Sequence, residues 1–437
     1  MSIFKEYDIR GIYCEELTEN HAYKIGRATA LFLKTKKIVV GRDVRLSSLA
    51  LKKALVYGIT DQGCDVVDVG YCSTPMSSWL SLKNDVVMVT ASHLPKEYNG
   101  FKITAKGGKQ IGKTTGLKKI EKLALSGKFP EPKRRGKVIT RKKAAKDYIA
   151  YVRRIAPGKL KRLKVVVDAG NGMAGLFVPD LFKNKPVKIF PMYFKPDGNF
   201  PNHEPNPVKP EMTKTLQAGV KKEKADFGIA YDGDCDRAFF IDEKGQRISP
   251  DMALLLLALH AVKKGQKVIY AVNCSKAVPE GIKAIGGIPI LSRVGRTNIA
   301  LNMRKHRAVI GGELSGHYFF KSNNYADSGD IAFLQMLYLL SKKKKPLSKI
   351  IKPLQKYFST GEINFKVANK NAAMKRVERE FKKFKILRID GISVDLGDWW
   401  FNLRPSHTEP VLRLTIEAKT KQALRKATIK LKKLVKG

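Results

Sequence analysis

Three times along the chain, a run of β-branched residues flanked by basic residues is followed by a helix-compatible stretch and two further apolar runs. Short runs rich in valine and isoleucine are typical of buried strands in a parallel sheet. Strands that alternate with helical segments indicate βαβ units. The three copies open with KKIVVGRD at residues 36–43, LKVVVDAGNG at 163–172 and QKVIYAVN at 266–273. The sequence therefore predicts three similar α/β domains with mixed or parallel sheets.

The pattern changes after about residue 360, where GEINFKV, a charged helical stretch and several short strands predict a smaller α+β domain. The segment KPLQKYFSTG, which holds this transition, is a plausible hinge. At 437 residues the chain is also too long for a single hydrophobic core. We expect four domains, at residues 1–150, 151–250, 251–358 and 359–437.

The charge of the chain is extreme, with 84 basic against 39 acidic residues and a formal net charge of +45. Such a balance favours anionic partners, either nucleic acid or phosphorylated small molecules. The basic residues are spread along the whole chain, and the sequence has no zinc finger and no aromatic RNA-binding motif. We therefore expect no specific nucleic-acid partner.

Cysteine usage and apolar segments indicate where the protein works. The five cysteines are scattered, odd in number and without CxxC spacing, which fits a reducing compartment. The N-terminal MSIFKEYDIRG is charged where a signal peptide would be apolar. The longest apolar stretch, MALLLLALHAV, is too short to cross a bilayer. We expect a cytoplasmic enzyme or binding protein with no membrane partner.

Polar loops follow the third strand of each repeat. DVVMVTASH ends at His93, ADFGIAYDGD at Asp234 and RAVIGGELSG at Gly316. Ligands of open α/β sheets collect beyond the carboxyl ends of the strands. We expect the three loops to line one shared cleft.

The loop DGDCDR places Asp232, Asp234 and Asp236 at every second position after a strand. Carboxylates this close repel one another unless a cation lies among them, and oxygen ligands suit Mg²⁺ or Ca²⁺. An EF-hand would need glycine where Arg237 stands and a continuing loop where FFID reads as a strand. A haloacid-dehalogenase-type phosphatase would need threonine or valine in place of Asp236. A capped acidic turn is the structural alternative, and a magnesium site is our prediction.

Ser92 and His93 stand side by side in TASHL, which lacks both glycines of a nucleophile elbow. Adjacent residues at the end of an extended strand point to opposite faces, so we expect His93 to be poorly placed as a base for Ser92. Ser92 could instead carry a phosphate, with magnesium bridging the phosphate oxygens. An ordinary turn residue remains the alternative.

The segment GGELSGH puts Glu313 and Ser315 two positions apart on an extended stretch. Side chains at this spacing can face one ligand, as acceptor and donor for neighbouring sugar hydroxyls. His317 could be a third polar contact or a core histidine.

The segment RPSHTEP gathers an arginine, two hydroxyl groups and loop amides in a turn bounded by prolines. Arg404 offers a planar fork, and Ser406 and Thr408 add short donors, a set that suits a phosphate group. A surface turn before the strand VLRLTIEA is the alternative.

Taken together, YDIRG, TASHLPKEYNGFK, DGDCDR, GGELSGH and RPSHTEP resemble the α-D-phosphohexomutase family, in this order and from residue 7 to residue 410. The resemblance implies three α/β domains and a smaller fourth around a central cleft. It implies a phosphomannomutase/phosphoglucomutase-type isomerase that interconverts the 1- and 6-phosphates of mannose or glucose. The reaction would use a phosphoserine, Mg²⁺ and a bisphosphorylated sugar intermediate, with a hexose 1,6-bisphosphate as activator and phosphorylated hexoses as partners.

The resemblance also implies roles for individual residues. Ser92 would carry the phosphate and hold Mg²⁺ together with Asp232, Asp234 and Asp236. Lys102 would be a general acid/base or a phosphate contact, and it forms the catalytic set with Ser92 and Arg237. The substrate-binding residues would be Tyr7, Arg10, Arg296, Glu313, Ser315, His317, Arg404, Ser406, His407 and Thr408.

Three positions depart from the family's pattern. Leu94 and His407 stand where asparagine is usual, in the serine loop and the phosphate loop. Leu314 replaces the methionine common in glucose and mannose enzymes or the glutamine of glucosamine enzymes, and its apolar character leans towards glucose or mannose. The alternatives are a phosphoglucosamine mutase and a Mg²⁺-dependent sugar phosphatase.

Overall fold

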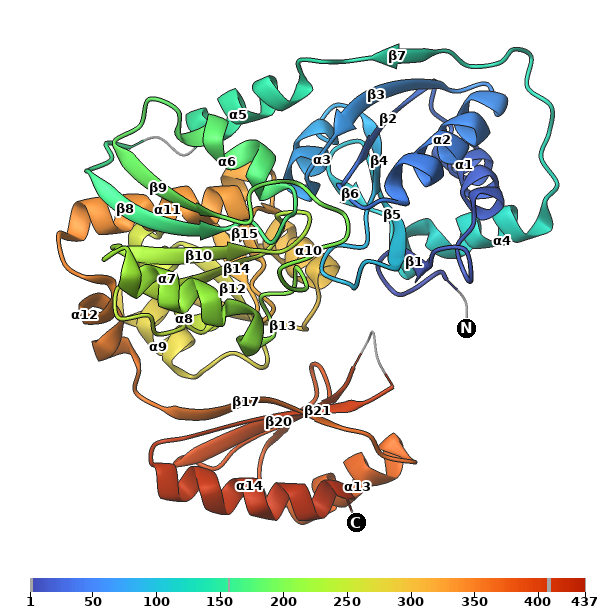
Figure 1. Cartoon of the computed structure of the whole chain (residues 1–437). Coiled ribbons are helices and arrows are strands. Elements are labelled where there is room, and N and C mark those ends of the chain that lie inside the picture. Colours follow the sequence, from blue (N-terminus) through green and yellow to red (C-terminus); the bar gives the residue numbers. More distant parts are fainter. Residues whose placement is uncertain (1–2, 156–157, 407–409, 437) are drawn as a thin grey trace. The chain divides into compact units, whose positions relative to one another are not determined.

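A computed structural model of the chain describes residues 3–155, 158–406 and 410–436 (Figure 1). The chain forms two compact units, each made of two segments. Unit 1 comprises Met1–Ile248 and His317–Leu347, and unit 2 comprises Ser249–Gly316 and Ser348–Gly437.

The first sheet of unit 1 has the strand order β1-β5-β4-β2-β3-β7, with β6 paired to β5. Strand β2 runs parallel to β3 and β4, whereas β5 runs antiparallel to β4 and β1. The strands are β1 (Ile9–Ile12), β2 (Lys37–Arg42), β3 (Asp65–Tyr71), β4 (Asp85–Val89), β5 (Tyr98–Ala105), β6 (Lys109–Gln110) and β7 (Val138–Thr140).

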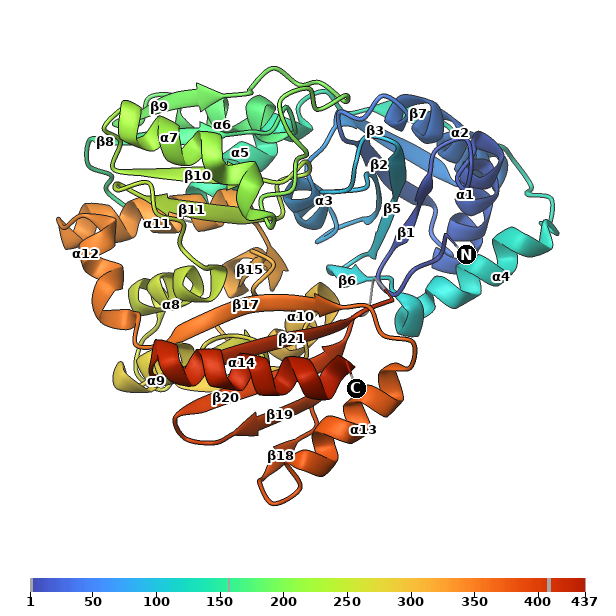
Figure 2. The same cartoon turned by 60° about the horizontal axis from the view of Figure 1, so that its bottom comes forward.

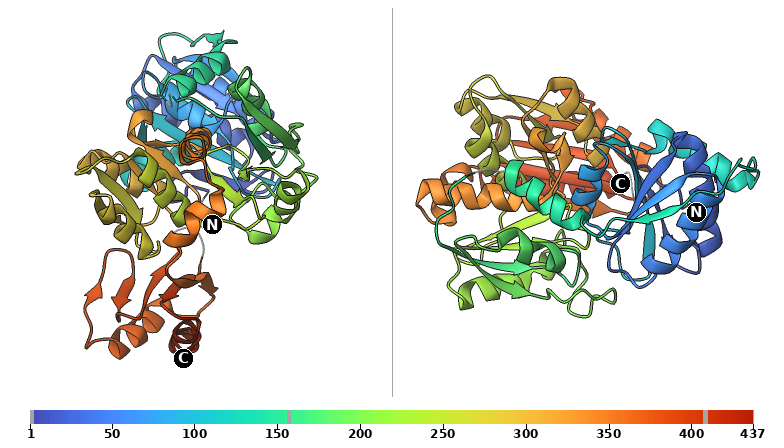
Figure 3. Two further views of the ribbon diagram at one scale, coloured as in Figure 1. Left: turned by 90° about the vertical axis from the view of Figure 1, so that its left-hand side faces the viewer. Right: turned by 90° about the horizontal axis from the view of Figure 1, so that it is seen from above.

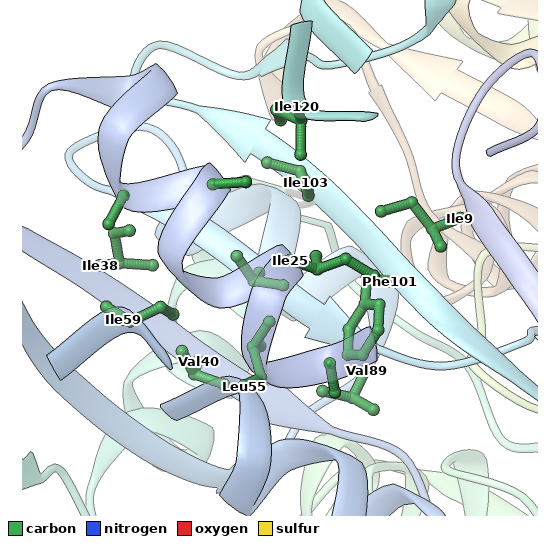
Figure 4. Close-up of a cluster of buried hydrophobic side chains, with 14 of the residues drawn as sticks. Ile9, Ile25, Ile38, Val40, Leu55, Ile59, Val89, Phe101, Ile103 and Ile120 are labelled. Carbon is green, nitrogen blue, oxygen red and sulfur yellow. The ribbon is translucent and has the colours of Figure 1, made fainter. Parts of the chain in front are cut away.

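Helices accompany this sheet and bury a continuous apolar core against it. They are α1 (Glu19–Leu33), α2 (Ser48–Asp61), α3 (Thr74–Leu80), the π-helical turn η1 (Lys113–Leu117), α4 (Lys118–Ser126) and α5 (Ala144–Ile155). Figure 4 shows side chains of α1 and α2, such as Ile25 and Leu55, beside those of the strands, such as Val40 and Phe101. This core holds the carboxyl ends of β2 and β4 in place.

The second sheet of unit 1 has the strand order β11-β10-β8-β9. Strand β8 is parallel to β9 and β10, and β11 is antiparallel to β10. The strands are β8 (Leu163–Asp168), β9 (Val187–Met192), β10 (Phe227–Tyr231) and β11 (Ala238–Asp242), with helices α6 (Ala174–Phe182), η2 (Pro210–Thr213) and α7 (Lys214–Lys222).

The second segment of unit 1 supplies a hairpin and a long helix. These elements are β15 (Tyr318–Phe320), η3 (Lys321–Asn323), β16 (Ala326–Asp327) and α11 (Gly329–Lys343). Phe333 of α11 is fully buried, and its ring packs against Phe182 of α6 and Phe227 of β10. Helix α11 therefore completes the core beneath the second sheet.

The first segment of unit 2 contains three parallel strands in the order β13-β12-β14. Its elements are α8 (Pro250–Ala261), β12 (Lys267–Ala271), α9 (Ala277–Ala284), β13 (Ile288–Ser292), α10 (Arg296–His306) and β14 (Ile310–Gly312). The longest apolar run of the sequence forms α8, which is buried from Pro250 to Ala258. A helix that is apolar on all sides belongs in a core.

The C-terminal segment folds as an antiparallel sheet of order β17-β21-β20-β19-β18. Helices α13 and α14 cover one face of this sheet (Figure 2), and both lie on the same side of it (Figure 3, left). The elements are α12 (Leu347–Ile351), η4 (Lys352–Leu354), β17 (Phe358–Phe365), α13 (Lys370–Glu380), β18 (Ile386–Leu387), β19 (Ile392–Asp395), β20 (Trp399–Pro405), β21 (Leu412–Ala418) and α14 (Lys421–Lys436).

The predicted repeat is present in the strand order. In β4-β2-β3, β10-β8-β9 and β14-β12-β13 the third strand of the repeat lies beside the first, and the first beside the second. All three sets are parallel. The predicted fold class, three similar α/β domains and a smaller α+β domain, is confirmed. Among the described residues, no helix is both long enough and apolar enough to span a membrane.

Candidate active site

Ser92 lies in the loop that connects β4 to β5, directly beyond the carboxyl end of β4. The residue is buried and has a left-handed backbone, with φ of 55°. Its amide donates to Thr90 Oγ1 over 2.9 Å. Non-glycine residues rarely adopt this conformation, and where it occurs the surrounding structure must hold it. The conformation of the serine loop is therefore fixed by specific contacts.

The three aspartates lie in the loop between β10 and β11, at the carboxyl end of β10. Asp232, Asp234 and Asp236 are buried, and each offers an oxygen within 4.8 Å of the others. Gly233 lies between the first two, and a Cβ added there would lie 2.7 Å from the carbonyl oxygen of Ser92. Only glycine lets the acidic loop approach the serine loop this closely.

The serine loop and the acidic loop are joined by direct hydrogen bonds. Ser92 Oγ donates to Asp232 Oδ2 over 2.8 Å. Thr74, the first residue of α3, donates through Oγ1 to Asp234 Oδ2 over 2.5 Å and through its amide to the Asp234 carbonyl over 2.9 Å. Ser73 caps this helix by accepting from the Met76 amide. Three strand ends of unit 1 thus meet at one point.

Lys102 of β5 reaches into the acidic cluster. Its Nζ lies 2.6 Å from Asp234 Oδ2 and 2.7 Å from Asp236 Oδ2. The strand register, which pairs Lys102 with Met88 of β4, brings the side chain to this position. A buried ammonium group therefore sits among three carboxylates.

Further cations and a histidine surround this cluster. Arg237 Nε donates to His317 Nε2 over 3.1 Å and lies 3.7 Å from Asp232 Oδ2. His317 Nδ1 lies 2.8 Å from Asp327 Oδ2. Asp236, His317 and Asp327 form a second group that could hold a metal, but both ring nitrogens of His317 face protein groups, so this ring is less suited to a metal than the three aspartates.

Tyr7 and Arg10 come from the N-terminal segment of unit 1. Arg10 pairs with Asp8 at 2.7 Å, and its Nη1 donates to the carbonyl of Ala91 over 3.3 Å. Ala91 directly precedes Ser92, so Arg10 lies at the serine loop. Tyr7 is half-buried in the segment that leads into β1.

The expectation for His93 is wrong in its geometry. His93 Nδ1 lies 3.3 Å from Ser92 Oγ, because the left-handed turn at Ser92 breaks the alternation of an extended strand. Burial, together with the positive charges of Arg237 and Arg10, lowers the pKa of His93 well below its usual value. The imidazole is therefore neutral near pH 7, while the Ser92 hydroxyl donates to Asp232.

The electrostatics of the cluster fit a cation. Burial and the charges of Asp236 and Asp234 raise the pKa of Asp232 well above its usual value. Burial and the charge of Asp236 act to raise the pKa of Asp234, but the contacts with Lys102 and Thr74 together outweigh them and the pKa is lowered. Asp234 Oδ1 is buried and has no hydrogen-bond partner among the described residues. Three carboxylates with an unsatisfied oxygen are a donor set that suits a hard divalent cation.

Unit 2 holds the predicted sugar-binding residues. Glu313 follows β14 and is buried; its Oε1 accepts from Ser315 Oγ over 2.7 Å. Its Oε2 accepts from the amide of Gly295 over 2.8 Å. Arg296 follows Gly295 and is the first residue of α10. Glu313 is therefore hydrogen-bonded both to Ser315 and to the residue that precedes Arg296.

The predicted phosphate loop begins at the end of β20, which includes Arg404. Arg404 is buried, and its Nη2 lies 2.7 Å from Glu362 Oε2, so the guanidinium already has a carboxylate partner. The amide of Ser406 donates to the carbonyl of Val411 over 2.9 Å. His407 and Thr408 lie outside the described residues.

Sequence reasoning missed two side chains that contact this cluster. Thr74 lies in CSTPM, beyond the carboxyl end of β3, and a polar loop at the same sheet edge was a usable signal. Asp327, which contacts His317, is the last residue of β16 in the β15–β16 hairpin and offered no comparable signal.

Comparisons with known proteins cover nearly the whole chain. The phosphoglucomutase/phosphomannomutase alpha/beta/alpha domains I, II and III match residues 1–131, 146–245 and 249–357, and the C-terminal domain of that family matches 362–428. A phosphomannomutase of Escherichia coli is 41% identical over 96% of this chain and 95% of its own length. A phosphomannomutase of Methanocaldococcus jannaschii is 36% identical over 100% and 98%. The crystal structure of a phosphoglucomutase/phosphomannomutase family protein from Burkholderia thailandensis is 31% identical, with a TM-score of 0.90 over 99% of this chain and 96% of that chain.

Proposed function

The chain belongs to the phosphoglucomutase/phosphomannomutase family, and from this premise we propose that it is a phosphohexomutase acting on mannose or glucose phosphates. It would interconvert the 1- and 6-phosphates through a phosphoserine and a bisphosphorylated sugar. The observation that carries the proposal is the 2.8 Å hydrogen bond from Ser92 Oγ to Asp232, inside a buried cluster of three carboxylates. A serine that only shaped a turn would not need this partner.

Ser92 is the residue that we propose carries the phosphoryl group. A phosphoserine adds about −1.5 to −2 charge at pH 7. Asp232, Asp234 and Asp236 would hold Mg²⁺, and the bound ion would neutralise charge on the phosphate. Arg237 and Arg10 lie at the serine loop and supply further positive charge.

In the first half of the reaction, the P–Oγ bond of phospho-Ser92 breaks and a bond forms from phosphorus to a free hydroxyl of the hexose monophosphate. That hydroxyl gives up its proton, and the released Ser92 Oγ takes up a proton to become a hydroxyl again. Return of the other phosphoryl group from the bisphosphate to Ser92 Oγ reverses these changes and completes the isomerisation. Asp234 and Asp236 hold Lys102 as an ammonium group, which supports the role of general acid or phosphate contact.

The remaining assignments concern the sugar and the phosphate that does not react. We assign Glu313 and Ser315 to sugar hydroxyls, on the strength of their paired geometry. A phosphate group at Arg404 would compete with Glu362 for the guanidinium. We assign the remaining substrate contacts to Tyr7, Arg10, Arg296, His317, Ser406, His407 and Thr408.

Three further points belong to the proposal. A hexose 1,6-bisphosphate would act as activator by phosphorylating Ser92. All five cysteines are free, which supports the cytoplasm as the compartment. The matched ranges support the domain boundaries expected from the sequence, at 1–150, 151–250, 251–358 and 359–437.

The test follows mannose 1-phosphate by ³¹P NMR with the purified protein, Mg²⁺ and a trace of glucose 1,6-bisphosphate. We expect a growing mannose 6-phosphate signal without inorganic phosphate, and Ser92→Ala should abolish it. Ser126→Ala, at the exposed end of α4, is the control and should retain it. Release of inorganic phosphate would show that the protein is a sugar phosphatase and not a mutase. If the protein turned over glucosamine phosphates and not mannose 1-phosphate, it would be a phosphoglucosamine mutase.

A further inference from the structure

Arg45 binds four carbonyl groups of the serine loop. Its Nη2 donates to the carbonyls of Ser92 over 2.8 Å and Leu94 over 2.6 Å. Its Nη1 donates to the carbonyls of Pro95 over 2.6 Å and Tyr98 over 2.9 Å. Each of the two terminal nitrogens thus uses both of its hydrogens on this loop. The whole segment from Ser92 to the start of β5 is gathered around one guanidinium group.

The residues around Arg45 hold its guanidinium group in this position. The side chain has no exposed surface, and its Nε lies 3.2 Å from Asp43 Oδ2. The ring of Phe200 lies over the guanidinium, 5.1 Å from its carbon. A Cβ added to Gly198 would lie 2.6 Å from the backbone around Arg45, so that loop packs closely as well. Burying a charge is costly unless it is paired and hydrogen-bonded, and here both conditions are met.

The carbonyl contacts explain how the loop can accept Leu94. Arg45 recognises residue 94 through its backbone oxygen, and the leucine side chain is only half-buried. The left-handed conformation of Ser92 is fixed in the same way, through the Ser92 carbonyl. The loop conformation therefore depends on the backbone and Arg45, and not on the side chain at position 94.

We propose that Arg45 is a positioning residue, which holds the serine loop so that Ser92 Oγ stays directed at the acidic cluster during phosphoryl transfer. The inference rests on the proposed function of Ser92. Arg45 touches the loop carbonyls and not the substrate, so its loss affects the transfer step more than substrate binding. Misplacement of a reacting group by about 1 Å can cost about a hundredfold in rate.

Arg45→Lys is the test variant, because it keeps the charge but a single ammonium cannot reach four carbonyls. Arg153→Lys is the matched control: Arg153 binds the carbonyls of Asp180, Leu181 and Lys183 at the end of α6, away from the serine loop. We expect R45K to lower kcat by about tenfold to a hundredfold with KM within about threefold. Deuterium exchange of residues 90–98 should be faster in R45K, and R153K should match the wild type in all three measurements.

The outcomes separate this inference from the proposed function. The intact mass of the wild type after incubation with glucose 1,6-bisphosphate reports whether Ser92 accepts a phosphoryl group. If the mass does not increase, the proposed function is wrong, irrespective of the role of Arg45. If the wild type is phosphorylated and turns over, equal kcat and equal loop exchange in R45K and R153K overturn the inference.

A second pair of variants tests the inference even if R45K does not fold. Leu94→Ala and Leu94→Asn keep the carbonyl that Arg45 binds and change only the side chain. We expect both to retain kcat within about twofold. A loss of more than about tenfold in either would show that the side chain holds the loop, and the inference would be overturned.

Discussion

Lys102 and a bound cation should neutralise the same carboxylates. The ammonium lies 2.6 Å from Asp234 and 2.7 Å from Asp236, and Asp232 completes a cluster in which one lysine faces three carboxylates. Lys102→Met keeps most of the apolar stem and removes the charge. Breaking a buried ion pair by removing one partner costs about 3–5 kcal/mol. We expect that loss in unfolding free energy when the protein is kept in EDTA.

Magnesium should reduce this loss. Saturation at about 100 times the dissociation constant stabilises a protein by about 2.7 kcal/mol, and the ion binds more strongly where no ammonium repels it. Because the ion also stabilises the wild type, the deficit of K102M should shrink in Mg²⁺ by the difference between the two stabilisations, about 1.4 kcal/mol for each tenfold by which the variant binds the ion more tightly. Catalysis is not expected to recover, because the ion does not replace the lysine in its proposed acid role.

Urea unfolding in EDTA and in Mg²⁺ measures the two deficits. Lys52→Met is the control, because Lys52 forms a similarly short ion pair with Asp68, at 2.5 Å, outside the acidic cluster. Its deficit should be the same in both buffers. Equal deficits for K102M with and without Mg²⁺ would refute the idea that lysine and ion share these carboxylates.

Two further predictions concern unit 1. Burial raises the pKa of Asp330 to about 6, above about 3.9 for an unfolded chain, so the folded state loses about 3 kcal/mol as pH rises from about 4 to above 6. Asp330→Asn lacks this loss. Urea unfolding should therefore show the variant gaining about 2 kcal/mol on the wild type between pH 4.5 and 7.5, and parallel pH profiles would contradict this prediction. Gly233→Ala places a Cβ 2.7 Å from the carbonyl oxygen of Ser92. We expect kcat to fall at least about tenfold and the unfolding free energy to fall by about 1–3 kcal/mol. Wild-type kinetics in this variant would mean that the serine loop and the acidic loop can separate freely.

The periodicity of the sequence predicted the fold because each strand of the repeat is buried and bounded by a recognisable helix. The acidic loop was predicted for a similar reason, since repulsion among three carboxylates is visible in the sequence itself. Lys102 came only from the family resemblance, because nothing distinguishes one lysine among 84 basic residues. Arg45 was missed for the same reason, as its four carbonyl partners lie about fifty positions away.

The error at His93 has a different origin. Alternation of side chains holds only for extended backbone, and the left-handed turn at Ser92 is imposed by contacts from distant segments. No local signal marks that turn, because serine does not favour it as glycine would. Local propensity therefore did not predict the backbone conformation of Ser92, because tertiary contacts hold this residue in a conformation that serine rarely adopts.

The two-segment construction of unit 1 has a consequence for how the protein is made. A ribosome releases residues up to Ile248 long before α11, and until then the rings of Phe182 and Phe227 lack Phe333, their partner in the finished core. Exposed apolar surface on a nascent chain invites aggregation. The whole of Ser249–Gly316 must therefore be translated between the second sheet and the helix that completes its core, and chaperones can act in that interval.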